Sequence, residues 1–250
     1  MAINIRSNTE IEKLRAAGAV VAQTHKLLEQ HIKPGITTQE LDEIAEKFIL
    51  SKGATPSFKG YGGFPGTICA SINDEVVHGI PSRSRILKDG DIISLDIGAY
   101  LNGYHGDAAR THAVGQVDDE ALRLIQITKE SFFEGVKYAK PGNHLHEISA
   151  AIQKYVEKNG FSVVRDLVGH GVGTELHEEP QIPNYKPIGR GPKLQVGMVL
   201  AIEPMVNLGD YAVRVLDDEW TVVTRDGSLS AHYEHTIVIT DNGHELLTDC

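Results

Sequence analysis

Cysteine is scarce in this sequence, and its scarcity excludes two classes of protein. The 250 residues contain two cysteines, Cys69 and Cys250, too few and too far apart for a disulfide scaffold or a cysteine-rich zinc module. No stretch approaches the roughly 18 apolar residues of a membrane-spanning helix, and the opening residues lack the apolar core of a signal peptide. We therefore expect a cytoplasmic protein without a membrane partner.

Basic residues are also few. The chain has 24 lysines and arginines against 34 aspartates and glutamates, so its net charge is −10. Because no basic run offsets this charge, we expect no nucleic-acid partner. The length and the 41% hydrophobic content are typical of a globular chain. We expect a monomer with a single domain over residues 1–250.

Four segments have the spacing and end signals of helices. Ser7 and Glu10 form a capping-box pattern before the first, where Gly18 shares the apolar face and would let another element pack closely. Further helices are expected from Thr38 to about Lys52, from Asp119 to about Tyr138 and from about Leu145 to Lys158. Strand-like runs occupy residues 67–72, 92–97, 108–114, 196–204, 221–224 and 235–240.

The order of helix, helix and strands occurs twice, and the two passages align. Residues 33–53 match residues 140–160 without gaps at an offset of 107, and both begin with Lys-Pro-Gly and end with Gly. The same offset places Asp96 on Glu203. Any two amphipathic helices share some identities, but the shared start, end and downstream strand favour duplication. We expect an α+β fold with a pseudo-two-fold repeat, roughly residues 7–115 and 116–245.

A predicted hairpin contains an acid on each arm. The Asn-Gly pair at 102–103 is a strong signal for a type I′ turn. With this turn, Asp96 pairs with Ala109 and Asp107 pairs with Gly98, so the two acids are diagonal neighbours on one face. The apolar residues around them indicate burial, and two buried anions repel each other unless a cation joins them. The hairpin therefore predicts one or two metal ions.

Further candidate ligands follow downstream. His170 lies between glycines that allow close backbone approach, Glu203 ends an apolar strand, and Glu234 precedes another strand. Taken singly, His170 reads as a hydrogen-bonded loop histidine, Glu203 as a strand-edge ion pair and Glu234 as a solvent-facing residue. Together with the two aspartates, they place four carboxylates and one imidazole on strand ends. This set suggests a two-metal site.

The motifs as a set resemble one family over essentially the whole chain. They are INDEVVHGIP (72–81), LDIGAYLNGYHGDAART (95–111), VGHGVG (168–173), HEEPQIPN (177–184), GMVLAIEP (197–204) and SAHYEHTIVIT (230–240). They look like methionine aminopeptidases of the type I, bacterial-like form, which have the creatinase-like pita-bread fold around a curved antiparallel sheet. The stretch between Glu203 and Glu234 is short, whereas type II enzymes carry a helical insertion there.

The resemblance implies removal of the initiator methionine from nascent proteins whose second residue is small. Nascent N-termini, including those at the ribosome, are then the expected partners. Two other functions remain open: a related pita-bread peptidase that cleaves next to proline, and a non-catalytic member that binds a partner. The absence of a separate N-terminal domain argues against the first. The ligand chemistry kept at all five matching positions argues against the second.

The resemblance also implies roles for the metal ligands. Asp107 and Glu234 would bridge two divalent ions, Asp96 would hold one ion, and His170 and Glu203 would hold the other. Glu203 would also accept the proton of the attacking water. An oxygen-rich set of ligands suits manganese, iron or cobalt as well as zinc.

The remaining implied residues bind the substrate. His177 would stabilise the tetrahedral oxyanion and His78 would orient the peptide, although each alone reads as a surface or turn histidine. The implied methionine pocket consists of Phe58, Tyr61, Phe64, Cys69 and Trp220. Leu176 stands where an aromatic wall residue is often found, so that wall departs from the family pattern.

Overall fold

The computed structural model describes residues 2–249, and Met1 and Cys250 lie outside the described residues. Its helices are α1 (Asn8–Glu29), α2 (Thr38–Ser51), α3 (Asp119–Val136) and α4 (Leu145–Lys158), with a short 3-10 helix at Tyr61–Gly63. All the predicted helices are confirmed, and the capping box at Ser7 is present. Within residues 2–249, no helix is long and apolar enough to cross a membrane.

Two larger antiparallel sheets carry the strands that build the site. One has the order β1-β4-β2, with β5 also paired to β4, and comprises β1 (Thr55–Pro56), β2 (Ile68–Ile72), β4 (Ile92–Leu101) and β5 (Tyr104–Ala113). The other has the order β15-β14-β9-β7-β8 and comprises β7 (Gly169–Gly171), β8 (Glu178–Ile182), β9 (Val199–Ile202), β14 (His235–Thr240) and β15 (Gly243–Leu246). These sheets and the helices form the expected α+β architecture.

Smaller sheets complete the fold. One has the order β13-β10-β6 and comprises β6 (Ser162–Val163), β10 (Met205–Asn207) and β13 (Ser230–His232). The other has the order β11-β12-β3 and comprises β3 (Glu75–Val77), β11 (Val213–Val215) and β12 (Val222–Thr224). The run predicted over residues 196–204 is shorter, because β9 ends before Glu203 and Pro204, and proline has no N–H for a ladder.

The segments that align at an offset of 107 make the same backbone contacts. The N–H of Gly35 donates to the carbonyl of Leu87 at 2.8 Å, and the N–H of Gly142 donates to that of Leu194 at 3.0 Å. Both glycines have a positive φ, +94° and +93°, a conformation that favours glycine. The Lys-Pro-Gly starts of the two helices therefore have one structural reason for their shared sequence.

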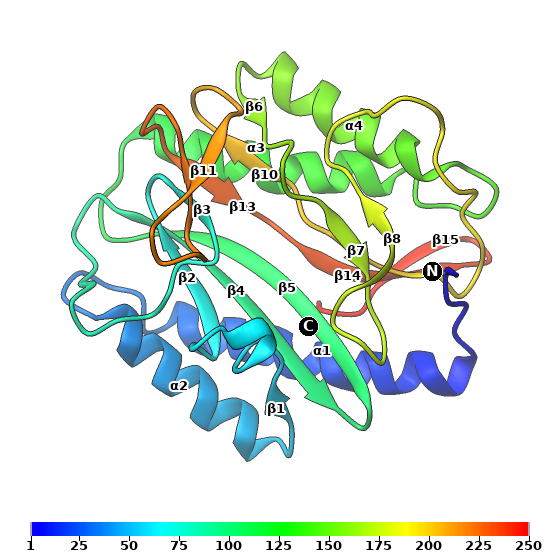
Figure 1. The fold of residues 1–250 in the computed structure, drawn as a ribbon, viewed down its shortest axis with the longest axis horizontal. Helices are drawn as coiled ribbons and strands as arrows, with labels where there is room; N and C mark the ends of the chain where they lie inside the picture. The colour runs from blue at the N-terminus through cyan, green and yellow to red at the C-terminus, as the bar shows by residue number, and fades with distance from the viewer. Residues whose placement is uncertain (1, 250) are drawn as a thin grey trace.

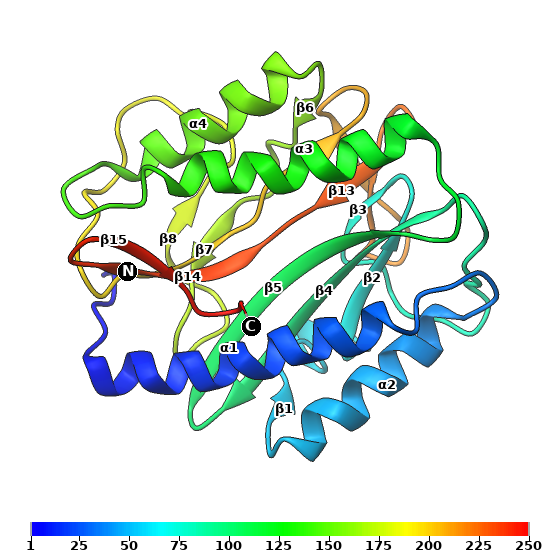
Figure 2. The same cartoon turned by 180° about the vertical axis from the view of Figure 1, so that it is seen from behind.

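The helices lie on one face of the strands. Figure 1 shows the strands in front, and Figure 2, from behind, shows α1 and α3 crossing in front of them. Helix α1 packs closely: a Cβ on Gly18 would lie 2.1 Å from the carbonyl oxygen of Leu247, and one on Gly106 of β5 would lie 2.7 Å from the Gly18 nitrogen. The predicted close packing at Gly18 is confirmed. With one face covered, the strands present their site residues on the other.

Candidate metal centre

A cavity of about 260 Å³ gathers every residue that the sequence singled out for a site. It is lined by Phe58, Tyr61, Phe64, Cys69, His78, Asp96, Asp107, His170, Leu176, His177, Glu203, Trp220 and Glu234. These residues come from both halves of the chain. The carboxylates and His170 lie together, and a wall lies beside them that consists of Phe58, Phe64, Cys69, Leu176 and Trp220.

The hairpin of β4 and β5 places two acids as its turn predicted. Asp96 pairs with Ala109, and Asp107 pairs with Gly98. The turn residues Asn102 and Gly103 have φ values of +54° and +88°, which fits a type I′ turn. Asp96 and Asp107 lie within their strands rather than at strand ends, so the expectation of strand ends was wrong for this pair. The turn sets the register, and the register puts both acids at the cavity.

His170 faces the carboxylates through one ring nitrogen. It lies on β7 between Gly169 and Gly171, where a Cβ would come within 2.3 Å and 2.2 Å of neighbouring carbonyl oxygens. Its Nδ1 donates to the carbonyl of Gly171 at 2.9 Å. Its Nε2 therefore keeps a lone pair, and lies 3.9 Å from Asp107 Oδ2 and 3.5 Å from Glu203 Oε1. A backbone acceptor on one nitrogen is the usual way to orient a ligand histidine.

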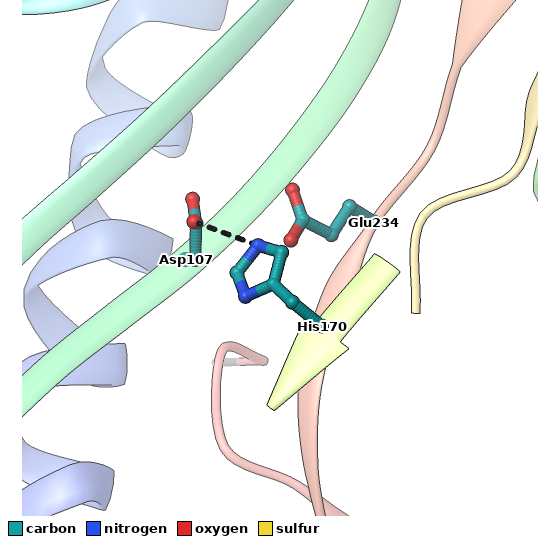
Figure 3. Close-up of side chains that lie close together, drawn as sticks. All are labelled: Asp107, His170 and Glu234. Carbon is teal, nitrogen blue, oxygen red and sulfur yellow. Dashed lines mark ion pairs between the residues drawn. The ribbon is translucent and has the colours of Figure 1, made fainter. Parts of the chain in front are cut away.

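The two glutamates are held by their backbones. The carbonyl of Glu203 accepts a hydrogen bond from Asn184 Nδ2 at 3.0 Å. The N–H of Glu234 donates to the carbonyl of Ala109 on β5 at 2.9 Å. This second bond ties the segment just before β14 to β5, two residues from Asp107. In Figure 3, Asp107, His170 and Glu234 point toward one another.

Burial makes this cluster electrostatically unfavourable without a cation. It raises the pKa of Asp96 to about 7 and the pKa of Asp107 well above its usual range, and the negative charge of Glu234 raises the latter further. Burial, followed by the charges of neighbouring carboxylates, also raises the pKa of Glu203 and of Glu234. Burial lowers the pKa of His170 to about 3, so this imidazole is neutral at neutral pH.

The unpaired oxygens fit a divalent cation. Asp96 Oδ1, Asp107 Oδ1 and Glu234 Oε1 are buried and have no hydrogen-bond partner within residues 2–249. Ligand atoms of Asp107, His170 and Glu234 all lie within 4.8 Å of one another. Carboxylate oxygens and a neutral imidazole are ligands of first-row divalent metals. A cation here would give the orphaned oxygens partners and offset their repulsion.

The wall beside the cluster is apolar. Phe58, Phe64, Cys69 and Leu176 are buried and pack together, with Trp220 against them. The rings of Phe64 and Trp220 meet edge to face, with centroids 5.2 Å apart. Burial raises the pKa of the Cys69 thiol well above its usual range, so this cysteine is a protonated wall residue. Leu176 lines the wall although it is not aromatic.

Two further histidines lie beside the cluster. His177 is exposed, and a hydrogen bond of 2.7 Å joins its Nδ1 to the hydroxyl of Tyr61. The centroid of its ring lies 4.3 Å from that of His170. Tyr61 is 46% exposed and therefore sits at the rim rather than in the wall. Burial lowers the pKa of His78 to about 4. His177 is exposed as a whole residue, but its ring packs beside that of His170, and this partial desolvation lowers its pKa as well. Both imidazoles are neutral at neutral pH.

Comparison with known proteins identifies the family. The sequence profile of metallopeptidase family M24 matches residues 12–241. The chain belongs to this family. Membership of a metallopeptidase family agrees with the buried carboxylate–imidazole cluster.

Within M24, the chain is one of the methionine aminopeptidases, as the motifs predicted. It is 60% identical to a methionine aminopeptidase of Clostridium acetobutylicum, over 99% of each chain. It is 61% identical to methionine aminopeptidase 1 of Bacillus subtilis, over 96% of each. The solved methionine aminopeptidase of Thermotoga maritima matches with a TM-score of 0.98 at 47% identity, over the whole of both chains.

The prolidase branch of the fold is more distant. The prolidase of Pyrococcus furiosus matches with a TM-score of 0.79 at 25% identity, over 98% of this chain and 65% of that one. These structures confirm the predicted pita-bread fold. They favour the methionine aminopeptidases over the proline-cleaving alternative.

Sequence reasoning missed two residues around the M24 site. Asn184 is fully buried and holds the Glu203 carbonyl. His232 is 1% exposed, and its Nε2 lies 3.7 Å from Glu203 Oε2. The two-residue spacing of His232 and Glu234 beside a strand was a signal for a shared face. Nothing local in the sequence indicates that Asn184 approaches Glu203.

Proposed function

We propose that the chain removes the N-terminal methionine from peptides and nascent proteins whose second residue is small. The observation that carries this proposal is the single cavity that joins a buried carboxylate–imidazole cluster to an apolar wall. The cluster suits water activation, and the wall suits an unbranched apolar side chain such as methionine. Names of relatives at 60% and 61% identity support the same activity.

The proposed cofactor is a pair of divalent ions, each manganese, iron, cobalt or zinc. Asp107 and Glu234 would bridge them, Asp96 would hold one, and His170 and Glu203 the other. Two such ions lower the pKa of a water held between them and polarise the scissile carbonyl. The three orphaned carboxylate oxygens support this assignment. Asp96 and Glu203 line the same cavity as the cluster of Asp107, His170 and Glu234, which supports their inclusion in the proposed set.

Glu203 would accept the proton of the attacking water. A general base must lie within hydrogen-bond reach of the proton that it takes. Glu203 Oε1 lies at the cluster, 3.5 Å from His170 Nε2. The same carboxyl group can then return the proton to the leaving amine, so the residue ends the cycle as it began.

The histidines and the wall would position the peptide. His177, held by Tyr61, would donate to the oxyanion, and His78 would orient the peptide backbone. Phe58, Phe64, Cys69 and Trp220 would enclose the methionine side chain, with Tyr61 at the rim. A donor aimed at the developing oxyanion stabilises the transition state more than the substrate.

The setting of the activity is also a proposal. Residues 1–250 would act as one catalytic domain, built from a repeat of roughly 7–115 and 116–245, and would work as a cytoplasmic monomer. Its partners would be nascent N-termini, including those at the ribosome. The net charge of −10 supports a peptide substrate over nucleic acid.

A three-peptide assay tests the proposed activity. The full chain, stripped with chelator and reloaded with Mn²⁺, Fe²⁺, Co²⁺ or Zn²⁺, is incubated with Met-Ala-Ser, Ala-Pro and Leu-Gly. Release of methionine from the first peptide alone is the expected result. Cleavage before proline alone would favour the prolidase-like alternative, and no turnover with any metal would favour a binding role.

A further inference from the structure

A buried histidine lies behind Glu203, outside the cavity that would hold the substrate. His232 ends β13 and is 1% exposed. Its backbone N–H donates to Thr111 Oγ1 at 2.8 Å, and its carbonyl accepts from the same hydroxyl at 2.8 Å. It also pairs with Met205 of β10. The backbone that carries the imidazole is therefore held by β5 and β10.

The ring faces one oxygen of the Glu203 carboxylate. His232 Nε2 lies 3.7 Å from Glu203 Oε2, while the other oxygen, Oε1, lies 3.5 Å from His170 Nε2. Each carboxylate oxygen thus faces a different imidazole. His232 Nε2 is itself buried without a hydrogen-bond partner within residues 2–249. A buried ring nitrogen without a partner costs about 1–3 kcal/mol, so a carboxylate oxygen this close is its natural acceptor.

The remaining gap is small. A hydrogen bond needs about 3 Å between nitrogen and oxygen, so the two atoms, now 3.7 Å apart, must approach by about 0.7 Å. His232 cannot move easily, but Glu203 lies at the cavity and its side chain is 14% exposed. Catalytic hydrogen bonds are often long until the site is loaded and then tighten. Binding of a cation at Oε1 would set the carboxylate plane against His232.

We infer that His232 is a positioning residue, whose Nε2–H holds Oε2 of Glu203 so that Oε1 is aimed at the metal position. The inference rests on the metal-ligand role proposed for Glu203. His232 lines a separate cavity on the other side, with His25, Arg110 and His112, and does not line the substrate cavity. It therefore acts through Glu203 and not on the substrate.

Metal binding tests the inference without any need for turnover. Isothermal titration calorimetry measures the Kd for Mn²⁺ of the full chain after a chelator has removed bound metal. It compares wild type with His232→Leu, His232→Phe and His232→Gln. Leu and Phe fill the space but lack the N–H, so we expect Mn²⁺ to bind about 10–100-fold more weakly. Gln keeps a side-chain N–H and should restore binding to within about threefold of wild type.

A matched control is His112→Leu. His112 Nε2 is also buried without a partner within residues 2–249, and the residue lines the same rear cavity as His232, but it does not line the metal-site cavity. This control should keep the wild-type affinity for Mn²⁺. Wild-type affinity in both apolar variants of His232, a Gln variant as weak as Leu, or an equal loss in His112→Leu would each overturn the inference.

Two further readouts separate the possible failures. With Met-Ala-Ser, kcat should fall with Mn²⁺ affinity in the Leu and Phe variants, while KM stays within about threefold. If the wild-type protein releases no methionine, the proposed function is rejected, and the Mn²⁺ titrations still decide the role of His232.

If the apolar variants fail to fold, ¹⁵N NMR spectra of the histidines in the wild-type protein decide the question. The neutral Nε2–H tautomer at His232 is expected, and the Nδ1–H tautomer would overturn the inference.

Discussion

Asp107 is a buried residue of the cluster and one of the two proposed bridging ligands. It is 3% exposed, and its ligand oxygen lies within 4.8 Å of the ligand atoms of His170 and Glu234. Asp107→Asn keeps the shape of the side chain but removes the charge that a bridging ligand needs. We expect methionine release to fall by more than about 100-fold, since changes in outer-shell partners alone cost 10–100-fold. The measurement is kcat/KM with Met-Ala-Ser at saturating Mn²⁺.

The same substitution should not destabilise the metal-free chain. Removing one of several buried like charges relieves repulsion, so the melting temperature in chelator should be unchanged or higher. Asp119→Asn, at an exposed position that begins α3, is the matched control and should keep wild-type turnover. Turnover near the wild-type level in Asp107→Asn would contradict the bridging role.

Single residues differ in how far the sequence reveals them. Asp96 and Asp107 could be placed on one face, because the Asn102-Gly103 dipeptide sets the register of two adjacent strands. His232 could not be placed behind Glu203, because that contact depends on where β13 settles against β5 and β10. A turn can be predicted from its own residues, whereas a contact between strands that are distant in sequence depends on how the whole fold packs.

At the scale of elements, α1 depends on a glycine in its middle. A Cβ on Gly18 would lie 2.1 Å from the Leu247 carbonyl oxygen, an atom of the backbone that cannot turn aside. Gly18→Ala should therefore destabilise the chain by at least about 1–3 kcal/mol, although alanine is the better helix former by about 1 kcal/mol. Urea unfolding measures the change. Ala19→Ser, one residue along the helix, should change stability by less than about 1 kcal/mol. A neutral or stabilised Gly18→Ala would show that the two elements can separate at no cost.

A histidine joins α1 to β5 and makes that contact sensitive to acid. His25 is 6% exposed, and its Nε2 donates to the Ala108 carbonyl at 2.8 Å. Burial, followed by the charge of Arg110, lowers its pKa well below the usual range. Below about pH 6.5 the unfolded chain binds a proton that the folded chain does not, so this part of the stability is lost as the pH falls.

His25→Gln tests the acid sensitivity, because glutamine can donate to Ala108 but cannot titrate. Unfolding free energies are measured in chelator at pH 7.5 and pH 5. Wild type should lose about 2 kcal/mol more than the variant over that interval, at most about 1.4 kcal/mol per pH unit. Equal losses in the two proteins would mean that His25 takes up its proton in the folded state.

Secondary-structure elements were predictable where residues at their own ends mark where they begin and stop. The capping-box pattern at Ser7 predicted the start of α1, and the predicted helix over Leu145–Lys158 has the observed bounds. Short strands such as β7 and β13 were not predicted, because three residues carry too little periodicity. Their place in a sheet is set by distant partners. Taken singly, His170 is therefore predicted to be a loop residue, although it lies on β7.

At the scale of the whole molecule, the offset of 107 anticipated a shared pattern of contacts. The isolated bridges Thr37–Ile86 and His144–Lys193 repeat at that offset. The repeat could not predict the contacts between the two halves, which we call the seam. There, Thr236 donates through Oγ1 to the carbonyl of Asp107 at 2.8 Å. This contact belongs to neither half alone, so an alignment of one half to the other contains no record of it.

The seam leads to a prediction about unfolding. The proposed ligands Asp96 and Asp107 come from the first half, and His170, Glu203 and Glu234 from the second, so a bound cation would tie the halves together. A ligand at 100 times its Kd stabilises a folded chain by about 2.7 kcal/mol, which for this size raises the Tm by about 5–10 °C. We expect calorimetry of the full chain to show one transition that moves upward by this amount when Mn²⁺ replaces chelator.

The comparison with Asp107→Asn makes this unfolding test specific. The variant should show one transition that Mn²⁺ leaves within about 2 °C of its position in chelator, because a weakened site gives little mass-action stabilisation. Nonspecific binding of Mn²⁺ to surface carboxylates would move both proteins alike. Two transitions in wild type, with only one responding to metal, would show that the halves unfold separately and that the cation belongs to one of them. A single transition that responds only in wild type requires the ligands of both halves to act as one site, which is the arrangement that the β5–β14 seam supports.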